Sequence, residues 1–206
     1  MGSAIDDLIS RARAFRSGSF LSQQSLYQRL IREGQSPKIL MIACSDSRID
    51  PSIIFDAKPG EIFMVRNMAS LVPPCIPDEL CHGTSAALEF GVLGLGVEHL
   101  IVLGHGHCGG IDALLRSAGK DGPKTDFIEP WLSCMTGVRD KMLREMPDGS
   151  HAQMARAIED ETVRQSVRNL RTFPWIDERL RAGELSVHGW HFDIAEGALR
   201  ALSENS

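Results

Sequence analysis

The stretch ILMIACSDSR, residues 39–48, joins an apolar run directly to a polar motif. A second junction of this kind, LIVLGHGHCGG, covers residues 100–110. A short apolar run bounded by glycine or polar residues is typical of a parallel strand whose two faces are both covered. In an open α/β sheet, ligands bind beyond the carboxyl ends of the strands. We therefore expect both polar motifs at the ligand-binding edge of one sheet, where they meet if the two strands are neighbours.

Together the two motifs hold side chains that ligate metals. Cys44, His105 and Cys108 offer two thiolates and an imidazole, which are preferred zinc ligands, and three protein ligands with a labile fourth position are typical of catalytic zinc. Asp46 is the candidate for the fourth position, because residues two apart in an extended segment lie on one side. Arg48 can bind the same carboxylate as a bidentate, charge-assisted partner. The carboxylate can therefore bind either the metal or the guanidinium.

Four motifs resemble the signatures of the β-class carbonic anhydrases. They are Cys44-Ser45-Asp46-Ser47-Arg48, Val65-Arg66-Asn67, His105 with Cys108, and His188-Gly189-Trp190. Their order and spacing are similar to those of that family, and the resemblance covers about residues 35–193. It implies reversible hydration of carbon dioxide to bicarbonate and a proton by zinc-bound hydroxide, with one Zn²⁺ per chain on Cys44, Asp46, His105 and Cys108.

The resemblance and the chemistry together predict a catalytic role for Asp46 and Arg48. A carboxylate cannot at once be the fourth zinc ligand and accept a hydrogen bond from the zinc hydroxide. We therefore expect an open state with Asp46 on Arg48 and a closed state with Asp46 on zinc. Because hydroxide competes better as the pH rises, the open state should gain with pH.

Five further residues are candidates for contact with substrate. Phe63, Met68 and Phe90 align with positions that the family uses to line the carbon dioxide pocket, and ordinary strand or helix core is the alternative for each. Gln35 matches a glutamine with which plant-type members bind substrate, although it could be a simple loop residue. Gly109 begins a helix whose free N–H groups favour thiolates and anions. There a glycine would let the backbone come close, or would only allow a tight turn.

Two other functions fit the same residues. Relatives with this ligand set hydrolyse carbonyl sulfide or carbon disulfide, and the width of the pocket decides between the substrates. A non-catalytic zinc module that senses bicarbonate or stabilises an assembly is the second alternative. The intact pair of Asp46 and Arg48 argues against a purely structural site, which has no use for a displaceable ligand.

Alternating strand and helix patterns predict an α/β fold with a mainly parallel sheet of four to five strands flanked by helices. We expect a single domain over residues 1–206, with an N-terminal helical arm at 1–34 and an α/β core at 35–206. The helix expected at 83–94 should bury Ala86, Ala87, Phe90 and Leu93. The resemblance implies that the arm reaches a partner subunit, in a homodimer or a dimer of dimers. The strands are expected at 38–43, 61–66, 99–103, 184–192 and 198–202. The other main helices are expected at 4–16, 20–31, 51–55, 127–146 and 151–172. Two more helices should begin at residues 108 and 174.

Composition restricts the partners and the compartment. The net charge of −5 argues against nucleic acid, since phosphate binding needs a basic face. No apolar run reaches the about 18 residues of a membrane span, and the first residues lack the layout of an export signal, so we expect the cytoplasm. The spacing of the five cysteines does not suggest a disulfide framework, and Cys75 and Cys81 are expected to be free thiols.

Overall fold

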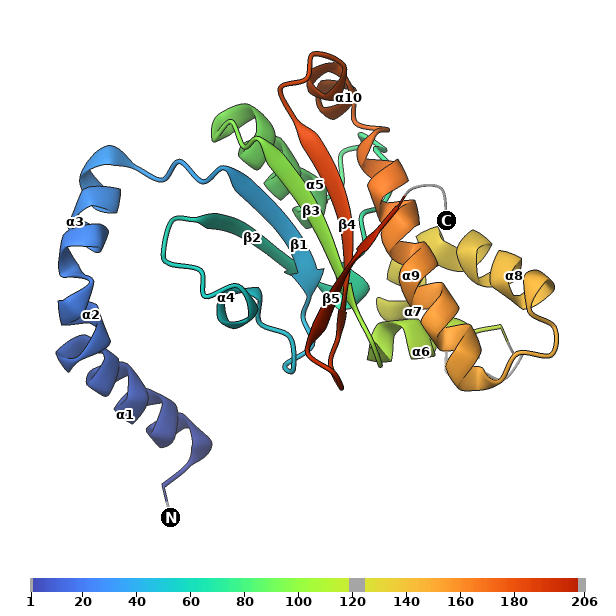
Figure 1. Cartoon of the computed structure of the whole chain (residues 1–206), viewed down its shortest axis with the longest axis horizontal. Coiled ribbons are helices and arrows are strands. Elements are labelled where there is room, and N and C mark those ends of the chain that lie inside the picture. Colours follow the sequence, from blue (N-terminus) through green and yellow to red (C-terminus); the bar gives the residue numbers. More distant parts are fainter. Residues whose placement is uncertain (1, 119–124, 204–206) are drawn as a thin grey trace. The chain divides into compact units, whose positions relative to one another are not determined.

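The computed structural model describes residues 2–118 and 125–203 of the chain (Figure 1). It divides the chain into two compact units, Met1–Ser36 and Pro37–Ser206. The boundary lies two residues beyond the end expected for the N-terminal arm. The sequence also predicts a polar loop at residues 119–125, and most of it lies outside the described residues.

The first unit consists of three helices, α1 (Ala4–Ser17), α2 (Ser19–Ser22) and α3 (Gln24–Glu33). Ser3 caps α1 in a reciprocal capping box with Asp6, which satisfies backbone N–H groups that the helix itself leaves unpaired. The second expected helix, 20–31, is observed as α2 and α3. The apolar stripe of α1 is exposed at Ile5, Leu8, Ile9 and Phe15.

The second unit is built on a five-stranded sheet in the order β2-β1-β3-β4-β5. The first four strands are parallel and β5 runs antiparallel at the edge, so the predicted fold class is confirmed. The chain leaves β1 to one side for β2 and returns on the other side for β3. This places the topological switch point between β1 and β3. The strands are β1 (Ile39–Cys44), β2 (Ile62–Asn67), β3 (His99–His105), β4 (Ser186–Asp193) and β5 (Ala198–Leu202).

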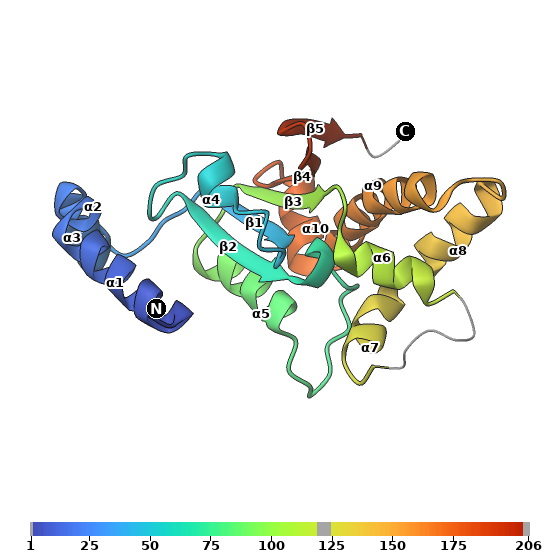
Figure 2. The same cartoon turned by 90° about the horizontal axis from the view of Figure 1, so that it is seen from below.

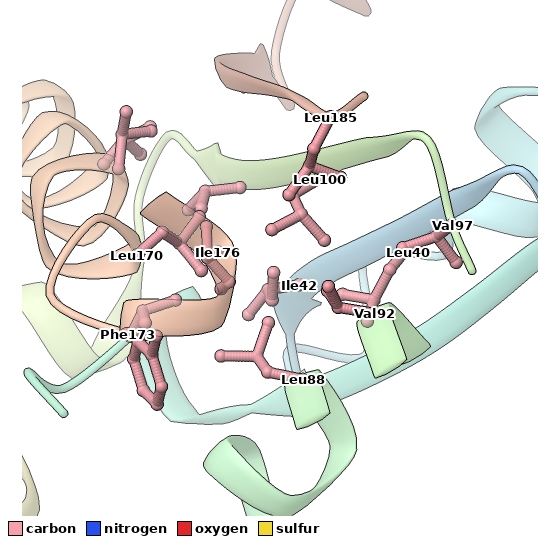
Figure 3. Packing of buried hydrophobic residues seen from close by; sticks show 14 residues of the cluster. Leu40, Ile42, Leu88, Val92, Val97, Leu100, Leu170, Phe173, Ile176 and Leu185 are labelled. Atoms are coloured by element: carbon pink, nitrogen blue, oxygen red, sulfur yellow. The ribbon is translucent and has the colours of Figure 1, made fainter. Parts of the chain in front are cut away.

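Both faces of the central strands are covered, which is why their sequences are continuously apolar. One face carries Leu40, Ile42, Leu100 and Val102, packed against helices α5 (Gly83–Glu89), α9 (His151–Leu170) and α10 (Pro174–Arg181) (Figure 3). The opposite face carries a smaller cluster of Met41, Ala43, Ile101 and Leu103, with Phe55 beside it. Figure 2 shows α5 and α4 (Pro51–Ile54) on opposite sides of the sheet.

A second core lies beyond the carboxyl ends of the strands, where helices α6 to α9 pack together. It includes Cys44 and Cys108, so both cysteine ligand candidates are anchored in it. Gly104 on β3 lets α9 approach closely, because a Cβ there would lie 2.4 Å from Cγ2 of Val163. The helices of this half are α6 (Gly109–Arg116), α7 (Ile128–Leu132), α8 (Thr136–Glu145), α9 (His151–Leu170) and α10 (Pro174–Arg181).

The expected inward face of the helix at 83–94 is wrong. The segment is α5 followed by one π-helical turn, Phe90–Gly94, and it buries Thr84, Leu88 and Val92. Ala86 is exposed and Ala87 half-buried, while Phe90 and Leu93 are 52% and 56% exposed. The helix turns this way because Gly91 gives room to Leu40, whose Cδ1 would lie 2.3 Å from an added Cβ.

The remaining helices differ from prediction mainly in their continuity. The helix expected at 127–146 is observed as α7, a 3-10 turn at Ser133–Met135, and α8. Helices α9 and α10 begin within a residue of prediction, and Pro174 stands at the first turn of α10. Within the described residues, no helix is both long and apolar enough to cross a lipid bilayer.

Candidate active site

The ends of β1 and β3 bring three ligand atoms together. Cys44 ends β1, His105 ends the neighbouring β3, and Cys108 follows three residues later. The three side chains are buried, and their ligand atoms lie within 4.8 Å of one another. The two Sγ atoms are 4.0 Å apart. Tetrahedral zinc with bonds of about 2.3 Å to sulfur needs two thiolates about 3.8 Å apart.

The histidine presents one particular ring nitrogen to the two thiols. His105 Nδ1 lies 2.9 Å from the carbonyl oxygen of Gly106, where an N–H donates, and this leaves Nε2 as the lone-pair nitrogen. Nε2 is buried and has no hydrogen-bond partner in the described part of the chain. A buried nitrogen without a partner, beside two thiols, fits a site for a soft divalent metal such as zinc.

The two thiols act as a pair in their protonation. The hydrogen bond from Cys108 lowers the pKa of Cys44, and this outweighs the effect of burial. The same hydrogen bond, together with burial, raises the pKa of Cys108. One thiolate therefore forms easily, and the second proton leaves when a cation is there to replace it.

Asp46 and Arg48 form the bidentate pair that the sequence suggested. Nε and Nη2 of Arg48 donate to the two carboxylate oxygens over 3.0 and 2.7 Å, and the Arg48 backbone N–H adds a third bond of 2.9 Å. These hydrogen bonds hold the pKa of Asp46 well below its usual range. Nη2 of Arg48 also donates to the carbonyl oxygen of His107, 2.9 Å away. The carboxylate thus lies on the guanidinium, beside the three-ligand group.

Arg66 holds the backbone of the loop that carries these residues. From β2, its guanidinium donates to the carbonyl oxygens of Cys44 (2.9 Å), Asp46 (2.8 Å) and Ile49 (2.5 Å). Three carbonyls that water would otherwise solvate are satisfied by one side chain. The loop after β1 is therefore fixed from the neighbouring strand.

A strained turn follows β2 beside the ligand group. Ala69 and Ser70 have φ values of 64° and 57°, which non-glycine residues adopt at a cost of about 1–3 kcal/mol each. Ser70 Oγ donates to the carbonyl oxygen of Leu103 over 2.8 Å, and Trp131 Nε1 donates to that of Met68 over 2.9 Å. These contacts over-determine the turn and hold Met68 against Gly110, where an added Cβ would lie 3.3 Å from Met68 Cγ.

Of the two glycines that begin α6, the second is the one that requires close packing. A Cβ on Gly110 would lie 2.9 Å from the Cβ of Ala69. An added Cβ on Gly109 meets no protein atom within 4 Å, so the expectation that Gly109 lets the backbone come close to substrate stays a prediction. Cys108 is the N-cap of α6, and the nearby backbone N–H groups of Ile111 and Gly110 act to lower the pKa of its thiol, although Cys44 and burial together raise that pKa.

Met68 also borders a mostly apolar groove of about 620 Å³, and the other predicted substrate residues lie elsewhere in the described chain. Phe63 pairs with Leu40, four rungs before Cys44 along the sheet, which is about 13 Å at 3.3 Å per residue. Phe90 packs against Phe63, with ring centroids 5.7 Å apart. Gln35 is exposed and belongs to the first unit, so its contact with substrate stays a prediction. The groove is lined by Val65, Arg66, Asn67, Met68, Gly83, Thr84, Phe127, Ile128 and Trp131.

Two residues that contact the site were missed in the sequence. Trp131 acts through Met68, 63 positions away, and no local pattern marks it. Glu159 on α9 accepts a hydrogen bond from the backbone N–H of Cys108 over 3.1 Å. Its signal was present, because a glutamate four residues before Val163 interrupts the buried face of a helix.

Comparison with known proteins agrees with this geometry. The sequence profile of the carbonic anhydrase family matches residues 39–199. Beta carbonic anhydrase 6, mitochondrial, from Arabidopsis thaliana is 35% identical over 95% of this chain, which spans 66% of the length of that relative. The chain belongs to the β-class carbonic anhydrase family. The resemblance drawn from the four motifs is therefore confirmed.

Solved structures of the family share the whole architecture. The β-carbonic anhydrase CcaA superimposes with a TM-score of 0.88 at 34% identity, over 97% of this chain and 88% of that one. One of two tetrameric β-carbonic anhydrases from Sordaria macrospora superimposes with a TM-score of 0.85 at 29% identity, over 97% and 96% of the two chains. The N-terminal helices are included in these matches, so they are part of the shared fold.

Proposed function

We propose that this chain is a zinc-dependent enzyme that reversibly hydrates carbon dioxide to bicarbonate and a proton. The observation that carries the proposal is the buried group of Cys44, His105 and Cys108 with the Asp46–Arg48 pair beside it. Membership of the β-carbonic anhydrase family supports the reaction.

Cys44, His105 and Cys108 would hold one zinc ion. When bound, zinc supplies a Lewis acid that makes hydroxide available from water at neutral pH. Two thiolates and a neutral imidazole balance the charge of the ion, so the positive potential that favours hydroxide must come from elsewhere. Arg48 and the N-terminus of α6 supply it in this chain.

Asp46 and Arg48 would control the geometry of the attack. Asp46 is kept ionised by its hydrogen bonds with Arg48, so it can accept a hydrogen bond from the reacting water and orient its lone pair. Arg48 would remain close to the bicarbonate anion as it forms. The apolar groove beside Met68 suits a small nonpolar substrate. We retain the proposal that Asp46 can exchange Arg48 for the metal, closing the site.

We further propose that the working form is a homodimer or a dimer of dimers. Phe63 lies about 13 Å along the sheet from the level of Cys44 and Phe90 packs on it, so if these two residues line a site it is that of a second copy. The exposed apolar face of Phe90 and Leu93 favours burial against such a copy. The tetrameric relatives from Sordaria macrospora support association.

Stopped-flow measurement of carbon dioxide hydration tests the proposal. Asp46→Asn should retain zinc and lose about 100-fold or more in kcat/KM, because the amide cannot replace the ionised acceptor. Asp56→Asn is the matched control, since Asp56 is exposed and has a φ of 48° that asparagine tolerates. It should keep wild-type activity.

The same assay separates the alternative functions. A wild-type chain that carries full zinc and hydrates no carbon dioxide would refute the proposal and favour a bicarbonate-sensing module. Turnover of only carbonyl sulfide or carbon disulfide would favour a hydrolase on the same scaffold. Equal rates for Asp46→Asn and wild type would remove Asp46 from the mechanism.

A further inference from the structure

Glu159 is a buried carboxylate that the proposed mechanism does not use. Glu159 lies on the side of α9 that contacts β3 and α6, and only 5% of the residue is exposed to solvent. Burying a carboxylate is costly unless it is paired or hydrogen-bonded. Its contacts therefore show what it does in this place.

Both oxygens of Glu159 face groups at the end of the sheet. Oε1 accepts the backbone N–H of Cys108 over 3.1 Å. Oε2 lies 3.6 Å from Nε2 of His191, a fully buried histidine on β4. Neither ring nitrogen of His191 has a hydrogen-bond partner in the described ranges, 2–118 and 125–203. The main hydrogen bond of Glu159 is thus the one that it accepts from the backbone N–H of Cys108, a candidate metal ligand.

The N–H that Glu159 accepts and the carbonyl that Arg48 contacts belong to one peptide group. The peptide between His107 and Cys108 donates to Glu159 at its nitrogen and accepts from Arg48 Nη2 over 2.9 Å at its oxygen. A carboxylate that polarises an N–H strengthens the carbonyl of the same peptide as an acceptor. One rigid plane therefore connects a buried carboxylate on one side to the guanidinium of Arg48 on the other.

This peptide needs an anchor because the turn that contains it is strained. His107 has a φ of 56°, in the left-handed region, and it is exposed. Cys108 then adopts an extended conformation as the N-cap of α6, and its Sγ lies 4.0 Å from that of Cys44. With Cys108 N–H bound to Glu159, the peptide cannot rotate without breaking a buried, charge-assisted bond.

We propose that Glu159 is a positioning residue that fixes the His107–Cys108 peptide, and through it both the Cys108 thiolate and the Arg48–Asp46 pair. The assignment rests on the proposed function, in that zinc is taken as the metal. It explains why a charged residue is kept on the buried face of α9, at hydrogen-bond distance from a ligand.

Two substitutions of Glu159 test the assignment. Glu159→Met removes the acceptor at similar volume and should weaken zinc binding about 10- to 100-fold and change the visible spectrum of the cobalt-substituted protein. With saturating zinc, kcat should fall while KM stays near wild type, because Arg48 and Asp46 lose their alignment. Glu159→Gln keeps an oxygen at the same place and should restore zinc affinity to within about threefold, together with the cobalt spectrum.

Glu161→Met is the matched control. Glu161 is equally buried on the same helix, but it binds Arg168 and Lys141 rather than the site. This variant should lower the melting temperature and leave zinc affinity and the cobalt spectrum unchanged. The same behaviour from Glu159→Met would overturn the assignment.

Two further outcomes also decide the matter. If Glu159→Met does not fold, Glu159→Gln decides alone, and wild-type zinc affinity and spectrum are required of it. A folded Glu159→Gln that binds zinc as poorly as Glu159→Met would overturn the assignment, because the charge beside His191 would then matter rather than the anchor. Zinc affinity is measured without substrate, so a chain with the expected affinities and no hydration activity would refute the proposed function alone.

Discussion

At the scale of single residues, Arg66 shows how much of the site depends on backbone carbonyls. Arg66→Met should remove three hydrogen bonds that hold the loop after β1 and lower the free energy of unfolding by about 2 kcal/mol. The value is modest because the Arg66 side chain is 32% exposed. Urea unfolding of the zinc-loaded protein measures the loss, and kcat/KM should fall with it as Asp46 is displaced.

Arg66→Lys is the informative companion to that variant. A lysine ammonium has one nitrogen, whereas two nitrogens of the planar guanidinium reach the three carbonyls, Nε that of Cys44 and Nη2 those of Asp46 and Ile49. Lysine should therefore recover less than half of the lost stability. Complete recovery would show that charge alone holds the loop.

The site residues that could be predicted from the sequence are those that lie in a short motif of metal-ligating residue types. Cys44 and Asp46 are two positions apart, and His105 and Cys108 are three apart. Residue type and spacing were therefore enough to predict them as site residues. Glu159 contacts the site from 51 positions beyond Cys108, and only the packing of α9 on β3 brings it there. The sequence shows a glutamate on the buried face of this helix, but no local pattern names Cys108 as its partner.

At the scale of elements, strands were predicted better than helix faces. The runs at 39–44 and 100–103 are apolar because both faces of these strands are covered, and this holds whichever way the strand is turned. The helix at 83–94 has two candidate apolar faces, and the larger side chains of Phe90 and Leu93 favoured the wrong one. A glycine at 91, which admits Leu40, decided the orientation instead.

The ion pair that connects Arg156 on α9 to Asp193 at the β4–β5 turn predicts how the stability of the fold depends on pH. Asp193 accepts from Arg156 over 3.2 Å and from the N–H groups of Ala195 and Glu196, and the arginine bond chiefly lowers its pKa. A depressed pKa in the folded state means that the ionised carboxylate stabilises the fold above the unfolded pKa of about 3.9, and that this is lost as the pH falls through the folded value.

Asp193→Asn should therefore be less stable than wild type at about pH 5 to 7, and the gap should close below about pH 4. Urea unfolding of both proteins after chelation gives the two curves without a contribution from acid release of metal. A gap that stays constant down to about pH 3 would show that folding does not lower the pKa of Asp193, and it would contradict the prediction.

At the scale of the whole molecule, apolar surface that no element of the core covers indicates association with another copy. Phe90 and Leu93 are more than half exposed on the π-helical turn, and Phe63 packs beside them. The sequence motifs did not predict this exposed apolar surface, because motif residues identify the site and not what packs outside it. Only the observed orientation of α5 shows that these side chains are exposed.

Phe90→Glu should separate the subunits and reduce activity together. A charge placed in the centre of an apolar interface costs about 3 kcal/mol, which weakens association roughly 100-fold. Analytical ultracentrifugation should show a smaller assembly than wild type at the same concentration. Hydration activity per zinc should fall as well, although Phe90 lies beside Phe63, about 13 Å along the sheet from the level of Cys44. Leu80→Glu, on an exposed loop, should change neither. If Phe90→Glu gave wild-type mass and full activity, the partner copy would have no part in the site, and Phe63 and Phe90 would be ordinary packing residues of their own chain.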